Sequence, residues 1–109
     1  MGSQHITYRC RDNGSDAIAH EEDGYFVVHA GSRLGEVRNL HDKVMLRFRH
    51  ALKNENALED DGLTLSDDEK FLYADEAARI ITGCLVNEMS WTAPDGSHPT
   101  LVSANRSLR

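Results

Sequence analysis

The first part of the chain alternates hydrophobic and polar positions in short runs that are separated by polar turns. We expect extended segments at 5–11, 17–20 and 25–30, with turns at 12–16 and 21–24. In the first run Ile6, Tyr8 and Cys10 share one face, which is typical of a half-buried strand. Asp23-Gly24 precedes an aromatic and β-branched run, so the second and third segments are predicted to form a hairpin.

The hydrophobic period then lengthens to that of a helix. Apolar residues recur at helical spacing and form one stripe, made of Val37, Leu40, Val44, Met45, Phe48 and Leu52. Most charged side chains of the same segment fall on the opposite side. The pattern therefore predicts an amphipathic helix that packs its apolar stripe on the preceding strands and ends at Asn54-Glu55-Asn56.

Shorter patterns follow in the second half of the chain. We expect an acidic connection at 58–62, a short strand at 63–65, a turn with capping-box spacing at 66–69, and a final hairpin of 89–92 and 100–102 around a turn at 94–96. A second helix is predicted from about Ala74 to Leu85. Its apolar face would be formed by Ala77, Ala78, Ile81 and Leu85. Asp75 and Glu76 in its first turn suit the positive end of the helix dipole.

Together these elements describe one domain of the α+β class. They predict a small antiparallel sheet of about 4–6 strands with two helices packed on it. The core should span about 5–102, with a polar tail at 103–109. The 109 residues are 39% hydrophobic, which suffices for a core without disulfides or metals. No apolar run is long enough to cross a membrane, and Cys10 and Cys84 form no metal-type pair, so we expect free thiols in a cytoplasmic protein.

Charge is segregated along the chain. Segment 33–53 carries six basic residues against two acids and is therefore +4, while the whole chain is −6, so the remainder carries −10. The basic residues are Arg33, Arg38, Lys43, Arg47, Arg49 and Lys53. Seven of the acids fall in segment 55–69. Two interpretations remain open: a solvated basic helix balanced by an acidic loop, or a basic face directed at phosphates.

The step Gly31-Ser32-Arg33 also has two interpretations. As a joint between strand and helix, Gly31 would end the strand and Ser32 would cap the helix. As an anion site, the first backbone N–H groups of the helix would bind a phosphate, with Arg33 and Arg38 as clamps. Trp91 is interpreted either as a core residue or as a stacking platform. The candidate nucleic-acid or anion-binding residues are Ser32, Arg33, Arg38, Lys43, Arg47 and Trp91.

No residue set predicts a catalytic centre. Ser32 lacks the Gly-x-Ser-x-Gly setting of a nucleophile, and the six histidines include no helical i, i+4 pair that would suggest zinc. The acidic groups of 59–61 and 67–69 lack the ligand order of an EF-hand, and no phosphate-binding loop with its lysine is present. We therefore expect no enzymatic activity, no metal and no cofactor.

The order of motifs resembles a known family over about 16–96. The motifs are aromatic-Val-Val-x-Ala-Gly-Ser at 26–32, Leu-Thr-Leu-Ser-Asp-Asp-x-x-Phe at 63–71, and Ala-Ala-x-x-x-x-Gly at 77–83, followed by Asn87 and Trp91. This arrangement is similar to the domain of unknown function 4357 family, and the second half resembles the RAMA domain. That family occurs at the ends of GIY-YIG nucleases and in restriction-modification and related bacterial or phage proteins. Where the family has Ser-Pro-Ser, this chain has Tyr73-Ala74-Asp75, and Asp75 is expected to replace part of the serine cap.

The resemblance implies an accessory role, and the charge pattern indicates which segment would bind a partner. We expect a non-catalytic nucleic-acid-associated binding module from a restriction, defence or mobile-element context, which binds DNA or RNA through Arg33 to Lys53. The alternative is a protein-interaction or regulatory domain whose acidic surface binds a partner protein or nuclease, as a mimic of nucleic acid or an inhibitor. Neither expectation fixes an oligomeric state.

Overall fold

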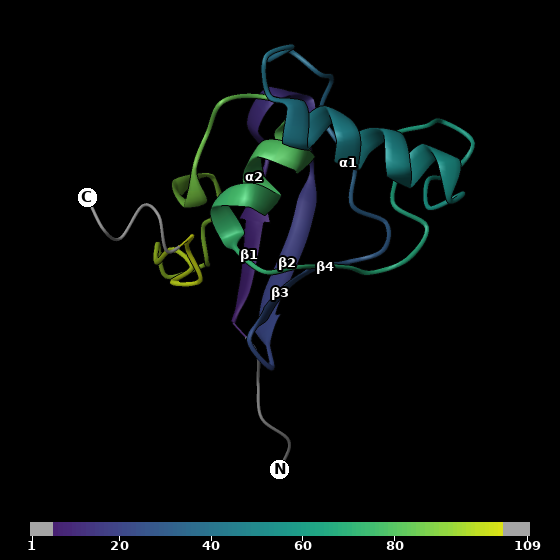
Figure 1. Ribbon diagram of the computed structural model, residues 1–109. Coiled ribbons are helices and arrows are strands. Elements are labelled where there is room, and N and C mark those ends of the chain that lie inside the picture. Colours follow the sequence, from purple (N-terminus) through teal and green to yellow (C-terminus); the bar gives the residue numbers. More distant parts are fainter. Residues whose placement is uncertain (1–5, 104–109) are drawn as a thin grey trace.

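The computed structural model describes residues 6–103 and shows a four-stranded antiparallel sheet with two helices. The strands are β1 (Thr7–Cys10), β2 (Ala17–Glu22), β3 (Tyr25–Val28) and β4 (Glu69–Phe71), arranged in that order. The helices are α1 (Lys43–Asn54) and α2 (Ala74–Thr82), with 3-10 turns η1 (Asp12–Gly14) and η2 (Glu88–Ser90). Figure 1 shows α2 packed across the sheet and α1 projecting to one side. The predicted α+β class is confirmed. His5 and the tail beyond 103 lie outside the described residues.

The predicted hairpin is present between β2 and β3, with His20 paired to Val27. Its turn residues Asp23 and Gly24 have positive φ angles of 54° and 81°, as a two-residue type I′ turn requires. On β1, Tyr8 and Cys10 are buried as the alternation predicted, but Ile6 is 55% exposed because it precedes the paired part of the strand. Both cysteines are free thiols, as expected.

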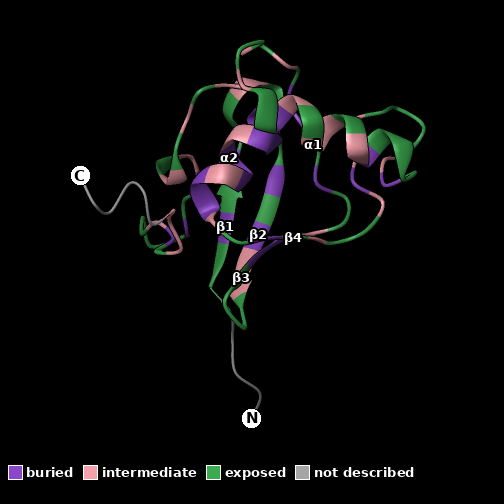
Figure 2. Cartoon of the chain, in the orientation of Figure 1, coloured by how far each residue is buried: buried purple, intermediate pink, exposed green. Residues whose placement is uncertain are grey.

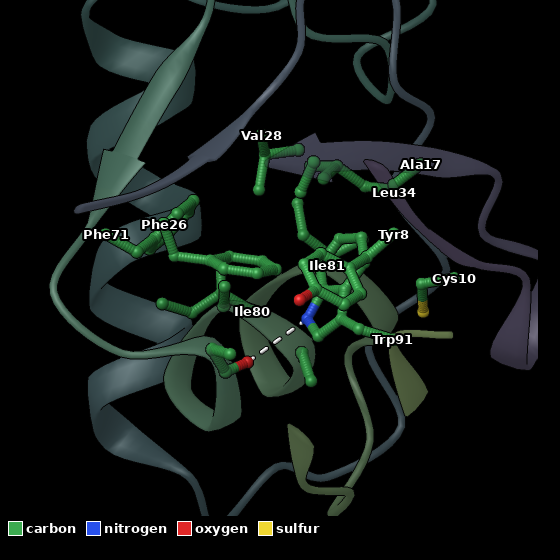
Figure 3. Close-up of a cluster of buried hydrophobic side chains, with 14 of the residues drawn as sticks. Tyr8, Cys10, Ala17, Phe26, Val28, Leu34, Phe71, Ile80, Ile81 and Trp91 are labelled. Atoms are coloured by element: carbon green, nitrogen blue, oxygen red, sulfur yellow. Dashed lines mark hydrogen bonds between the residues drawn. The ribbon is translucent and has the colours of Figure 1, made fainter. Parts of the chain in front are cut away.

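Trp91 is at the centre of the core between the sheet and α2. Its side chain is fully buried, its ring packs edge-to-face on Phe26 with the centroids 5.0 Å apart, and its indole N–H donates to the Ala74 carbonyl at 3.1 Å (Figure 3). The indole therefore has both its apolar surface and its polar group satisfied inside the protein. The interpretation of Trp91 as a core residue is confirmed.

The first helix is shorter than the apolar stripe predicted. It begins at Lys43, where the Asp42 carboxylate accepts a hydrogen bond from the Met45 N–H at 3.1 Å. Leu40 lies before this cap and is 71% exposed. The prediction that the helix includes Val37 and Leu40 was wrong because the preceding segment donates its backbone N–H groups to α2 instead. Gly35 N–H bonds to the Ile81 carbonyl, and Arg38 and Asn39 N–H groups both bond to the Gly83 carbonyl.

Several short predictions in the second half need correction. Segment 66–69 leads into β4, which pairs with β3, so no capping box forms there. The predicted strand at 63–65 makes only isolated bridges, and the predicted final hairpin is absent from the described residues. Instead, Thr92 bridges to Arg9, and the Leu101 carbonyl accepts from the Ala74 N–H. In each case backbone hydrogen bonds to residues distant in sequence determine the structure of the segment.

The second helix ends at Thr82, three residues earlier than expected, and Leu85 is exposed. Gly83 terminates it with a φ of 74°, a left-handed conformation that glycine adopts without penalty. At its other end, Asp75 does not cap the helix, because its carboxylate accepts from the Ser103 N–H at 3.0 Å. The expected replacement of the serine cap was therefore wrong. No helix within 6–103 is long and apolar enough to cross a membrane.

Arg49 joins the two helices and the segment before α1. Its guanidinium donates to the carbonyls of Ile80 at 2.7 Å, Gly35 at 2.6 Å and Ile81 at 3.1 Å. Two of these carbonyls belong to the last turn of α2, where a cation also complements the helix dipole. Burial lowers the pKa of Arg49 to about 10, so the group still carries its charge at neutral pH.

Replacing Arg49 with lysine should destabilise the fold by about 3 kcal/mol, because an ammonium group cannot reach all three carbonyls in the planar geometry of guanidinium. Arg47→Lys is the matched control on the exposed side of the same helix, and it should change stability by less than about 0.5 kcal/mol. Urea unfolding of the two variants and the wild type measures the difference. Equal midpoints for both variants would contradict this role for Arg49.

Gly83 lies against the backbone of Glu36 and Val37. A Cβ atom there would collide with the Glu36 carbonyl oxygen, whereas one at Gly62, which has a similar φ of 72°, would meet nothing within 4 Å. Gly62→Ala should therefore cost only the left-handed strain of about 1–2 kcal/mol. Gly83→Ala should cost about 1–3 kcal/mol more because the neighbouring backbone must shift. Thermal and urea unfolding of both variants separates strain from collision.

Candidate functional site

The Gly31-Ser32-Arg33 step does not begin a helix. Ser32 is buried, and its hydroxyl accepts a hydrogen bond from the Ile18 N–H at 3.1 Å. Arg33 exchanges two backbone hydrogen bonds with Asp16, of 2.9 and 3.0 Å, and also bridges to Thr64. The predicted helix cap was wrong because this segment joins β3 to neighbouring extended segments. Ser32 is therefore occupied in the fold and does not face a solvent anion.

The two arginines of the predicted anion site are nevertheless brought together. Arg33 and Arg38 both line a surface hollow of about 360 Å³ beside η1. We call it the η1 hollow, and its polar and small lining residues are Asn13, Gly14, Arg33, Gly35, Glu36 and Arg38. The segment that carries both arginines is not helical, and it brings Arg33 and Arg38 to the same hollow.

Asn13 organises one wall of the η1 hollow. It adopts a left-handed conformation with φ of 56°, and its amide group donates to the Glu36 and Thr82 carbonyls, both at 2.7 Å. Its amide oxygen accepts from Arg38 Nε at 2.7 Å. Asparagine tolerates this backbone conformation better than most residues. The bond to Nε orients the Arg38 guanidinium and leaves its two Nη groups without a hydrogen-bond partner among the described residues.

Arg33 lies against the acidic connection. Its Nη1 is 3.5 Å from Asp61 Oδ2, a long contact between two partly exposed groups. The hydroxyl of Thr64 and the N–H groups of Leu63 and Thr64 bond to the Asp61 carboxylate at 2.7–2.9 Å. These hydrogen bonds, with a smaller contribution from Arg33, lower the pKa of Asp61 to about 2. Asp61 thus primarily folds the 61–64 turn, and it offsets part of the Arg33 charge.

Helix α1 presents a separate set of cations. Lys43, Arg47 and Lys53 are exposed on it and have no ion pair within the described residues; we call them the basic stripe. His50 is exposed between them, and no acidic residue occurs within α1. Figure 2 shows the exposed residues of α1 beside the mostly buried α2. Of the six basic residues in 33–53, only Arg49 donates its guanidinium hydrogen bonds to backbone carbonyl groups within the described residues.

The structure also contains a polar cluster that the sequence analysis missed. His20 Nδ1 lies 2.7 Å from His29 Nε2, and His20 Nε2 lies 2.7 Å from Glu22 Oε1. Helical i, i+4 spacing does not indicate this cluster, because His20 and Glu22 lie on β2 and His29 directly follows β3. The signal was His20 and Glu22 two positions apart on one strand face, with His29 two residues beyond the Val27 that pairs with His20.

Burial and the neighbouring His20 lower the pKa of His29, although Asp68 acts in the opposite direction. One hydrogen bond between two imidazoles needs an unprotonated nitrogen, so both rings cannot be imidazolium while it persists. Within 6–103, no three His, Cys, Asp or Glu residues are arranged to hold a metal ion.

Comparison with known protein families, curated proteins and solved structures found no match to this chain. The resemblance to the domain of unknown function 4357 family therefore stays a prediction.

His29 should titrate below its ordinary pKa of 6.5. At pH values between the lowered pKa of His29 in the folded chain and 6.5, the unfolded chain binds more protons than the folded one. The stability contributed by neutral His29 is therefore complete above pH 6.5 and declines as pH falls through this window. His29→Gln should reduce the loss of stability between about pH 7.5 and about pH 5.5, whereas His50→Gln on α1 should not. Urea unfolding at both pH values measures the slopes. Identical slopes for the wild type and His29→Gln would contradict the assignment.

Proposed function

We propose that this protein is a non-catalytic nucleic-acid-binding module that contacts phosphates through the basic stripe of α1. One observation carries the proposal: a helix of 12 residues exposes Lys43, Arg47 and Lys53, contains no acid, and forms no ion pair through these side chains within the described residues. Unpaired surface cations release counterions from a nucleic acid when they bind its phosphates.

The acidic remainder of the protein shapes this binding. The net charge is −6, so the protein as a whole repels a polyanion, and we expect duplex phosphates to contact α1, which contains no acid. Just beyond α1, burial, Glu55 and Asp67 raise the pKa of Glu69, so acidic residues also oppose a polyanion at this end of the helix. We therefore expect modest affinity, a small number of phosphate contacts and strong dependence on salt.

The family resemblance also supports an accessory role associated with nucleic acids, because the similar domains occur beside nucleases and in restriction-modification proteins. A binding module for phosphates has no need of a nucleophile or a metal. Contacts to phosphates give affinity without sequence specificity, so we expect this module to bind nucleic acids of different sequence equally well. We propose the module as a tether that holds a nucleic acid near a partner activity.

The second candidate is a protein-interaction domain that uses its acidic surface. The group of Glu55, Asp67 and Glu69 favours it, since their mutual repulsion would be relieved by a basic partner. A pull-down from a bacterial lysate before and after nuclease treatment separates the two functions. A basic partner protein that resists nuclease and is lost with Asp67→Asn supports the second candidate.

For the leading proposal, Arg47→Gln should weaken binding of a DNA or RNA duplex and reduce the slope of log K against log salt by about 1. Lys70→Gln, which removes an equal charge from β4 where Lys70 lies over the Tyr25 ring, is the matched control and should leave the slope unchanged. Fluorescence anisotropy at several salt concentrations gives both quantities. No binding at low salt would rule out the proposal, and an equal loss for both variants would show that only net charge matters.

A further inference from the structure

We propose that the η1 hollow is a binding site for a phosphate monoester, held between the guanidinium groups of Arg33 and Arg38. This site is separate from the basic stripe and does not depend on the proposed function. Its volume of about 360 Å³ lies at the lower end of the range for small-molecule sites, roughly 300–1,000 Å³. It admits a terminal phosphate together with part of the group that carries it.

Arg38 is oriented before any ligand arrives. Asn13 accepts from Arg38 Nε, and Asn13 is itself fixed by two hydrogen bonds to the Glu36 and Thr82 carbonyls. The Arg38 backbone is also held, because its N–H donates to the Gly83 carbonyl at 2.8 Å. A guanidinium restrained in this way loses less side-chain entropy on binding. Its two Nη groups, which have no hydrogen-bond partner in 6–103, can donate to phosphate oxygens in the bidentate manner.

Arg33 supplies the second cation of the η1 hollow. Its backbone is fixed by the paired hydrogen bonds to Asp16, so the side chain starts from a defined position. Its 3.5 Å contact with Asp61 is long and partly exposed, and such pairs contribute little. Asp61 also accepts shorter hydrogen bonds from Leu63 and Thr64. Arg33 can therefore exchange its contact with Asp61 for one with a phosphate, and the carboxylate keeps its other hydrogen bonds.

The charge balance favours a monoester over a diester. Glu36 also lines the η1 hollow and opposes part of the positive charge of the two arginines. A phosphate monoester carries about −1.5 to −2 at neutral pH and therefore gains more from the pair than a singly charged diester. Gly14 has no side chain, and a Cβ atom there would meet nothing within 4 Å, so phosphate oxygens can approach this part of the backbone closely.

The direct test is a titration of the full ¹⁵N-labelled chain with a nucleoside 5′-monophosphate, with the nucleoside as the control ligand. We expect saturable shifts of the Gly14 and Gly35 amides with the monophosphate alone. Arg38→Gln and Arg33→Gln should each raise Kd about tenfold. Lys53→Gln removes the same charge from the basic stripe and should have no effect on this Kd, whereas Glu36→Gln should lower it.

A spectrum unchanged outside the η1 hollow verifies that each variant is folded. The inference is overturned by the absence of saturable shifts at millimolar monophosphate, by equal binding of the nucleoside, or by an unchanged Kd in the Arg33→Gln/Arg38→Gln double variant.

A second arm identifies the source of the monoester. Oligonucleotides with a 5′-phosphate and with a 5′-hydroxyl are compared through the same two amides. Shifts with the phosphorylated oligonucleotide indicate the end of a nucleic acid, and shifts with the mononucleotide alone indicate a free nucleotide. Equal shifts with the 5′-hydroxyl oligonucleotide contradict the monoester site. Arg47→Gln tests the two sites separately. If it weakens duplex binding but leaves the Kd for the monophosphate unchanged, the η1 hollow and the basic stripe are independent sites.

Discussion

The fold depends on satisfying the carbonyl groups at the end of α2. A helix leaves its last carbonyls without internal partners, and here these groups are buried among the segments that pack around them. Arg49 bonds to Ile80 and Ile81, Gly35 N–H bonds to Ile81, and Asn13 bonds to Thr82. The Gly83 carbonyl that follows accepts two further N–H groups. One helix end therefore fixes α1, η1 and segment 35–39 in relation to one another.

The η1 hollow is a consequence of this arrangement. Gly35 must approach the Asn13 and Thr82 carbonyls so closely that a Cβ atom would lie 2.5 and 2.7 Å from their oxygens. Arg33 and Arg38 flank Gly35 in sequence, and both line the depression beside this close backbone contact. The residues that stabilise the fold and those that offer charge to a ligand are thus neighbours in sequence but have different partners.

Cations with the same formal charge have three different roles. Arg49 donates its hydrogen bonds to carbonyl groups, Arg79 is paired with the Asp42 carboxylate at 3.4 Å, and the basic stripe is exposed to solvent. Acids are divided in a similar way, since Asp42 caps α1 and Asp61 folds a turn. A charge count along the chain cannot make this distinction, because it depends on which polar groups become buried. The +4 of segment 33–53 overstated the positive charge available to a partner.

Local patterns by themselves determined the α+β class, the hairpin at Asp23-Gly24, the existence of both helices and the basic character of α1. These features follow from period, turn chemistry and composition, which act over a few residues. Only the tertiary structure decided that α1 begins at Lys43 and not near Val37, that 69–71 is a strand, and that Trp91 is in the core. It also decided that Arg33 and Arg38 share a hollow while Ser32 does not reach it. The physical reason is the same in each case: buried backbone groups must find hydrogen-bond partners, and here the partners lie far away in sequence.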